Sequence, residues 1–349
     1  IIGSCAGHCA LDCGGNVFIG CSAGIKNRGG CNVAVGPEAL HAADSSISGN
    51  TGGYNIGLGY HAGYHITTGS DNTFAGRNAG AYMTTGSANI FMGKYAAGNN
   101  SAIVTGNNNI GLGLCAAKVL TSGSDNVFIG QYTGGSNTTG SYNVAIGFYA
   151  GTQTVDTGTS VYIGYWAGSK KRGHGNVGLG YNALVGSSTP ANNLGENNIA
   201  IGREAAYNIT SGQKNFAGGY KALCEISTGC YNLAFGRKAA GAAVVTGNHN
   251  IVMGDCTAMG LTSGASNIAI GEGAMMNGTI TGNYNVVFGY EAACQMSSGS
   301  YNVVIGKSVN PASTTGDKQF IIGCGTSKWI CGDSSWHIQP GAGIRDTAG

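Results

Sequence analysis

The chain contains many short stretches in which fixed apolar positions alternate with a variable one. Each stretch ends at a glycine, as in Asn143 to Gly147 (NVAIG), and we call this glycine the reference glycine of its copy. Three residues before it stands Val or Ile in most copies, and one residue before it Ile, Leu or Met. Such alternation of β-branched residues is typical of a short strand with one buried face. We therefore expect a short strand in each copy. The two fixed apolar positions, each of which forms a column when the copies are aligned, should face inward.

The phrase recurs along nearly the whole chain. There are 19 reference glycines, mostly 17 residues apart and otherwise 16 to 23. A short period sustained in this way is typical of a solenoid. We predict an all-β fold, a β-solenoid or β-roll of about 19 coils with a 17-residue period, which at ~4.8 Å per coil gives a rod of roughly 90 Å. The reference glycines are Gly3, Gly20, Gly36, Gly59, Gly76, Gly93, Gly113, Gly130, Gly147, Gly164, Gly180, Gly202, Gly219, Gly236, Gly254, Gly271, Gly289, Gly306 and Gly323.

Three further columns indicate how a coil closes. A glycine seven residues before the reference glycine, such as Gly123, predicts a tight turn with positive φ. An alanine three residues after it, such as Ala150, predicts a second wall packed close to the strand. An asparagine four residues before it can form a ladder of side-chain amides from coil to coil, or can simply tolerate a turn. The ladder candidates are Asn55, Asn72, Asn89, Asn109, Asn126 and Asn143.

The repeat pattern divides the chain into a solenoid domain, residues 1–326, and a tail, residues 327–349. The tail breaks the period, so we expect it to cap the stack or to begin a further domain. Each coil is thin and buries few large side chains, which favours lateral association of several chains, most simply as a trimer. The chain opens in mid-repeat without a methionine, as a processed or truncated sequence would.

Composition narrows the function classes. The 349 residues include 65 glycines and only 4 prolines, with 42% hydrophobic and 9% charged residues, which is typical of neither a disordered chain nor collagen. The net charge of +2 gives no electrostatic reason to expect nucleic acid or an anionic membrane as a partner. No apolar run approaches the ~20 residues of a membrane-spanning helix, so we expect no membrane insertion in this segment.

Candidate chemistry is sparse, and we predict no enzyme: no catalytic, cofactor-binding or metal-binding residue stands out. The segment Cys5 to Cys13 (CAGHCALDC) has zinc-ligand residue types, but its side chains fall in different columns of the repeat and need not converge. The 12 cysteines favour an oxidising, secreted or surface setting. Cys21 with Cys31 and Cys224 with Cys230 are candidate pairs, although sequence cannot settle the pairing.

Two surface rows remain. Aromatic residues two positions after the reference glycine can stack on one another or on sugar rings, which makes them a candidate glycan contact. Four asparagines lie in Asn-x-Ser/Thr sequons and are candidate glycosylation sites, or else plain turn residues. The aromatic row is Tyr95, Tyr132, Tyr149 and Trp166, and the sequons are at Asn99, Asn137, Asn208 and Asn277.

The phrases NVAIG (Asn143 to Gly147), NIAIG (Asn198 to Gly202) and NVAVG (Asn32 to Gly36), each with Ala three residues further on, resemble head repeats of trimeric autotransporter adhesins. The phrase TTGSDNTFAGRNAG (Thr67 to Gly80) resembles repeats of tail-fibre-like proteins of phages and other viruses. The resemblance covers about residues 1 to 323. It implies a β-roll that associates as a trimer.

We therefore expect a non-enzymatic structural fibre or adhesin, located outside a cell, on a cell surface or on a virion. Its expected partners are further copies of itself and possible cell-surface glycans, without a cofactor. The alternative is an extracellular filament subunit that stacks head to tail through open coil ends. A third reading, ice binding, would require flat rows of threonine, and the threonines stand beside turns, as Thr67, Thr84 and Thr121 do.

Overall fold

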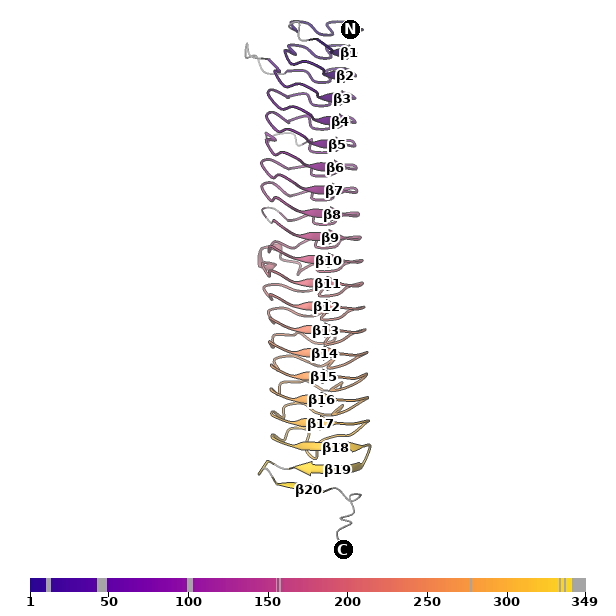
Figure 1. The fold of residues 1–349 in the computed structure, drawn as a ribbon, viewed down its shortest axis with the longest axis vertical. Coiled ribbons are helices and arrows are strands. Elements are labelled where there is room, and N and C mark those ends of the chain that lie inside the picture. The colour runs from indigo at the N-terminus through magenta and orange to yellow at the C-terminus, as the bar shows by residue number, and fades with distance from the viewer. Residues whose placement is uncertain are drawn as a thin grey trace. The chain divides into compact units, whose positions relative to one another are not determined.

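The computed structural model describes residues 1–10, 14–42, 49–98, 103–154, 156, 158–276, 278–332, 334–335 and 337–340. It is an all-β solenoid, which confirms the predicted fold class (Figure 1). The chain separates into two compact units, residues 1–174 and 175–349, and the coil geometry is the same within each.

In the first unit, each copy contributes one three-residue strand, and consecutive strands pair in parallel without a register slip. The copy that ends at Gly3 contributes only an isolated bridge between Ile2 and Ile19. The strands are β1 (Val17–Ile19), β2 (Val33–Val35), β3 (Ile56–Leu58), β4 (Thr73–Ala75), β5 (Ile90–Met92), β6 (Ile110–Leu112), β7 (Val127–Ile129), β8 (Val144–Ile146) and β9 (Val161–Ile163).

The second unit repeats this arrangement from β10 to β18 and then changes it. There β19 pairs antiparallel with β18, and β20 antiparallel with β19, so the parallel stack ends where the tail begins at Ser327. The strands are β10 (Val177–Leu179), β11 (Ile199–Ile201), β12 (Phe216–Gly218), β13 (Leu233–Phe235), β14 (Ile251–Met253), β15 (Ile268–Ile270), β16 (Val286–Phe288), β17 (Val303–Ile305), β18 (Phe320–Cys324), β19 (Ser327–Gly332) and β20 (Ile338–Pro340), with a 3₁₀ turn η1 (Pro190–Asn192).

The side chains that face the core are not the ones that the sequence pattern suggested. In β1, Phe18 is 1% exposed, whereas Val17 and Ile19 are 43% and 38% exposed. The same order of burial holds in the strands from β2 to β17, although Gly218 in β12 is itself buried. The expectation that the fixed β-branched columns face inward was therefore wrong. The variable middle residue lies in the core, and the fixed columns lie on the outer face of the sheet.

In several coils, the size of the variable middle residue is matched by the residue four positions after the reference glycine. Phe128 is paired with Gly134, where a Cβ atom would lie 2.5 Å from the aromatic ring. Where the middle residue is Ala217, the matching position is Leu223, and both are fully buried. In these coils, large and small side chains complement each other between the two walls and fill the volume. Gly57 and Gly63 are both small, and Leu40 and Phe74 of the neighbouring coils fill the space beside them.

The reference glycines and the glycines of the earlier column are required for different reasons. Gly130 has φ of 129°, and a Cβ atom there would lie 2.6 Å from the carbonyl oxygen of Gly147 in the next coil. Gly123 does not have the positive φ that we expected, which corrects the turn prediction. It is glycine because a Cβ atom would strike the carbonyl oxygen of Gly140 in the neighbouring coil.

The asparagine column forms a continuous ladder inside the coils. Asn72 donates from Nδ2 to Oδ1 of Asn55 at 3.0 Å and to the carbonyl oxygen of Gly86 at 2.9 Å. Its backbone N–H donates to the same Oδ1 of Asn55 at 3.1 Å. Each amide therefore satisfies buried groups in the coils on both sides, which would be costly to leave unpaired. Amide-to-amide bonds of this kind link Asn55, Asn72, Asn89, Asn109, Asn126 and Asn143 in order.

Candidate interaction face

The outer face of each strand presents four side chains per coil. In the coil of β8 these are Tyr142, Val144, Ile146 and Phe148, which alternate with inward-facing residues. Alternation places successive side chains on opposite faces of the extended strand, so Val144 and Ile146 point outward on either side of the buried middle residue. Tyr142 and Phe148 flank the strand at its corners, since Tyr142 has φ of 61° and Phe148 follows Gly147 with φ of 129°. We call the residue five positions before the reference glycine the leading edge, and the residue one position after it the trailing edge. The residues three positions and one position before the reference glycine form the centre of the face.

The centre of the face is apolar throughout both units. Neither centre column carries a charged residue in any strand from β1 to β18, and Thr73 is its only polar side chain. Leu58 is 41% exposed and Met92 is 45% exposed. The centre columns expose on the order of 1,000 Å² in each unit, more than the few hundred Å² that monomeric proteins usually leave as one apolar patch. A surface of this kind is typical of an interaction site.

The two edges of the face are rich in aromatic and charged side chains. Tyr142 on a leading edge is 65% exposed, and Tyr165 on a trailing edge is 44% exposed. Along the trailing edge of the second unit, Arg237 Nη2 lies 2.7 Å from Asp255 Oδ2, and this hydrogen bond lowers the pKa of Asp255. An apolar centre with a Tyr- and Arg-rich rim is the composition of a protein–protein interface.

Three residues of the predicted aromatic row stack on one another. The ring centroids of Tyr132 and Tyr149 lie 4.9 Å apart at 23°, and those of Tyr149 and Trp166 lie 5.5 Å apart at 40°. Tyr95 is separated from Tyr132 by the coil that carries Cys115, and its ring lies 5.5 Å from the ammonium nitrogen of Lys94. Stacking on a sugar needs a free ring face. Tyr149 has a ring of the row on both sides, whereas Tyr132 and Trp166 each stack on one neighbour of the row.

The two sequon asparagines that the structure describes, Asn137 and Asn208, are not freely accessible. Asn137 is 0% exposed, so a glycan on its side chain is incompatible with the folded coil, which corrects that candidate. Asn208 is half-buried and donates from Nδ2 to Glu225 Oε2 at 2.7 Å, so its amide nitrogen is engaged by the next coil. Asn99 and Asn277 lie outside the described residues.

The cysteines and other titratable groups do not converge on a reactive site within the described part of the chain. The described cysteines are all unpaired, including both candidate pairs, and no cluster of three or more His, Cys, Asp or Glu side chains there could hold a metal ion. Cys13 of the cysteine-rich segment lies outside the described residues. Burial raises the pKa of Cys224 to about 12, with a further contribution from Glu225, which disfavours the thiolate that a nucleophile would need.

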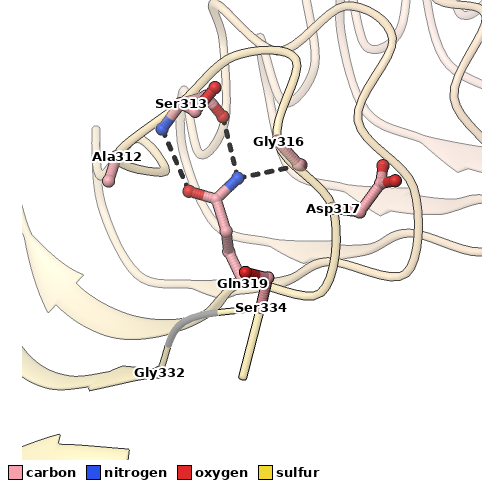
Figure 2. Close-up of a pocket in the computed structure, with 7 residues that line it drawn as sticks. All are labelled: Ala312, Ser313, Gly316, Asp317, Gln319, Gly332 and Ser334. Atoms are coloured by element: carbon pink, nitrogen blue, oxygen red, sulfur yellow. Dashed lines mark hydrogen bonds between the residues drawn. The ribbon is translucent and has the colours of Figure 1, made fainter. Parts of the chain in front are cut away.

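One cavity of about 250 Å³ lies between the last coil and the antiparallel tail of the second unit (Figure 2). Gln319 replaces asparagine at the end of the ladder there. Its Nε2 donates to the carbonyl oxygens of Ser313 and Gly316, and its Oε1 accepts from the backbone N–H of Ser313 at 3.0 Å. Asp317 accepts at 2.7 Å from the backbone N–H of Ser300. The polar lining is thus used by the fold itself, and the cavity is best explained as a consequence of the ladder's last rung.

The fold and this outer face define a parallel β-solenoid protein with one unbroken apolar surface per unit. No protein-family model, curated protein or solved structure matches this chain. Within the described residues, none of the helical segments is long and apolar enough to cross a membrane.

Proposed function

We propose that this protein is a non-enzymatic structural fibre or adhesin, displayed outside a cell, on a cell surface or on a virion. Its copies associate laterally, most simply as a trimer, through the outer face of the sheet. The observation that carries the proposal is the exposed apolar centre of that face. At on the order of 1,000 Å² in each unit, its area is comparable to the ~800 Å² that each partner contributes to a standard stable interface.

A second copy of the chain is the occupant that fits this face best. The face repeats the same four-residue row in every coil, so a partner needs a matching repeat to cover it, and another copy has one. Lateral burial also supplies the apolar area that a thin coil lacks on its own. Repeated weak sites on the assembled fibre would then bind a surface ligand, such as glycans, by avidity.

The head-to-tail filament is less well supported. An open parallel edge invites the addition of another strand. In the second unit, however, the edge of β18 is occupied by β19, which turns back antiparallel and is itself paired with β20. A hairpin at this position breaks the parallel pattern that a further coil would have to continue.

The ice-binding reading is also less well supported, because the threonine hydroxyls are used within the solenoid. The Oγ1 atoms of Thr67 and Thr121 donate to the carbonyl oxygens of Thr84 and Thr138 in the next coil, at 3.1 and 3.0 Å. These threonines stand at part-buried turn positions rather than on the outer face of the sheet. A thermal-hysteresis assay tests this reading, and a clear positive result would revive it.

The test of the proposal is the mass of the purified chain in solution, together with negative-stain microscopy. We expect a discrete oligomer with the mass of three chains. Met92→Lys, in the centre of the face on β5, should shift it to monomer, because lysine would bury an unpaired charge in the interface. Ile103→Lys is the matched control, since Ile103 is 63% exposed but lies in a loop away from the strand.

Each outcome has a distinct meaning. A monomeric natural chain, or an oligomer that Met92→Lys leaves intact, would overturn lateral association through this face. Filaments of indefinite length would favour the head-to-tail alternative instead.

A further inference from the structure

The two edges of the face carry complementary side chains in the same coil. In β4, Asp71 stands on the leading edge and Arg77 on the trailing edge, and both are exposed. In the coil of β3 the edges are Tyr54 and Tyr60. The ring of Tyr60 already stacks on His61 at 3.9 Å and lies 6.0 Å from the Arg77 guanidinium. A neighbouring Tyr54 would therefore meet its edge. Since no ion pair joins Asp71 to Arg77 within the described chain, this complementarity is available to a neighbouring copy.

The second unit shows the same relation across two adjacent coils. On the leading edges of β13 and β14, Tyr231 and His249 stack with centroids 5.0 Å apart at 3°. On the trailing edges of the same coils lie Arg237 and Asp255, which form an ion pair. Placed side by side in register, these pairs would bring Arg237 to the ring of Tyr231 and the carboxylate of Asp255 to the imidazole of His249. A carboxylate beside an imidazole is a favourable contact. The ring of Tyr231 is already stacked on His249 at 5.0 Å and lies 4.9 Å from the Lys214 ammonium. Arg237 would therefore meet the edge of that ring.

We propose that neighbouring copies pack in register, with the leading edge of each coil against the trailing edge of the same coil in the next copy. This proposal rests on the lateral association proposed above and specifies its direction and register. In a closed ring of laterally packed copies, each copy presents its leading edge to one neighbour and its trailing edge to the other. The ring closes only when there is no net axial slip between copies. A constant slip would instead produce an open, helical assembly.

Charges in the second unit oppose a slip by one coil in either direction. In register, Lys214 on the leading edge of β12 faces Tyr220 on the trailing edge of that coil. A slip of one coil would place Lys214 opposite either Arg203 or Arg237. Like charges brought together at an interface are unfavourable, so both slipped arrangements are penalised, whereas the registered one places Lys214 beside an uncharged tyrosine. Ion pairs of Arg203 with Glu204 and of Arg237 with Asp255 reduce this penalty.

A slip that brings each leading edge to the trailing edge of the preceding coil, which we call a backward slip, carries a second penalty at the end of the stack. Lys318 on the leading edge of β18 would then face Lys307 on the trailing edge of β17. In register, Lys307 instead faces Tyr301 of its own coil in the neighbouring copy. The edge columns thus contain attractive pairs in register, and lysines that oppose a backward slip. A slip in the other direction is opposed at Lys214 but would bring Asp71 to Lys94 and His249 to Glu272.

The experiment uses charge reversal on the full chain, with sedimentation equilibrium at low ionic strength as the readout. Asp71→Lys and Arg77→Asp should each raise the dissociation constant of the oligomer about tenfold, because each creates a like-charge pair across the interface. The double variant Asp71→Lys/Arg77→Asp should return it to within about threefold of the natural chain. Lys118→Asp, on a different side of the coil, is the matched charge-reversal control and should have no effect.

A second rescue distinguishes register from slip. If copies were displaced by one coil, Asp71 would face Lys94 on the trailing edge of β5, and Asp71→Lys would be rescued by Lys94→Asp rather than by Arg77→Asp. That result, or an oligomer indifferent to Asp71→Lys, would overturn the registered arrangement while leaving lateral association intact. A monomeric natural chain would show instead that the proposed function itself has failed. Circular dichroism confirms that each variant folds.

Discussion

Asn137 is a residue whose surroundings do not suit it. It occupies a core column that holds Leu120 in the preceding coil, it is 0% exposed, and neither its Nδ2 nor its Oδ1 has a hydrogen-bond partner. A buried amide left unpaired costs about 1–3 kcal/mol. Asn137→Leu should therefore raise the free energy of unfolding by about 1–2 kcal/mol. Thermal and urea unfolding measure this, and Leu120→Asn is the reverse control, which should destabilise the protein.

His41 provides a pH-dependent prediction at the same scale. Burial lowers its pKa from the usual value of 6.5, its Nδ1 is buried without a partner, and its ring stacks on Tyr64 at 4.9 Å. The unfolded chain therefore binds a proton at this histidine more readily than the folded chain does. Stability should fall as the pH drops below about 6.5, until the folded-state pKa of His41 is passed.

His41→Phe isolates this effect, because phenylalanine keeps a ring against Tyr64 but cannot bind a proton. Between pH 7 and 5 the variant should lose less stability than the natural chain in urea unfolding. Parallel stability curves for the two proteins would show that His41 does not contribute.

At the scale of the element, each strand depends on the match between its middle residue and the facing wall. Phe128→Ala should cost about 3–4 kcal/mol because it opens a cavity. Gly134→Leu alone should also destabilise, since its side chain would collide with the ring of Phe128. The double variant should recover much of the loss, because it reproduces the combination of Ala217 with Leu223.

The backbone at this position accepts the larger residue. Gly134 has φ of 58° and Leu223 has φ of 47°, so a leucine already occupies the same left-handed corner elsewhere in the chain. Urea unfolding of the four proteins gives the coupling energy directly. Additive losses in the double variant would mean that the two walls do not compensate each other.

At the scale of the whole molecule, the proposed assembly depends on an apolar centre and on charged edges, and the two respond differently to ionic strength. Burial of apolar area is not screened by salt, whereas exposed charge pairs are. We therefore expect the natural chain to remain oligomeric as the ionic strength rises from 0.05 to about 0.5 M. The tenfold effect of Asp71→Lys should shrink over the same range. Sedimentation at both ionic strengths tests this, and dissociation of the natural chain at high salt would contradict an apolar centre.

Much of the fold could be read from the repeats. The spacing of the reference glycines placed the strands, and the asparagine column lies where a ladder would require it. The pattern could not predict the burial of single residues that depart from the repeat consensus. Asn137 is part of a sequon, which suggests a surface position, yet seven residues after a reference glycine the coil has already turned back into the core.

The sequence by itself determined the period, the strand positions and the parallel stacking, because these follow from local residue spacing that every copy repeats. Only the tertiary structure decided which face of the strand lies inside. Both faces of the alternation are apolar, as Phe18 and Val17 show, so hydrophobicity could not orient the strand. The closing of the coil orients it: Asn16 and Phe18 stand two residues apart and share a face, and the asparagine ladder must be sheltered from water.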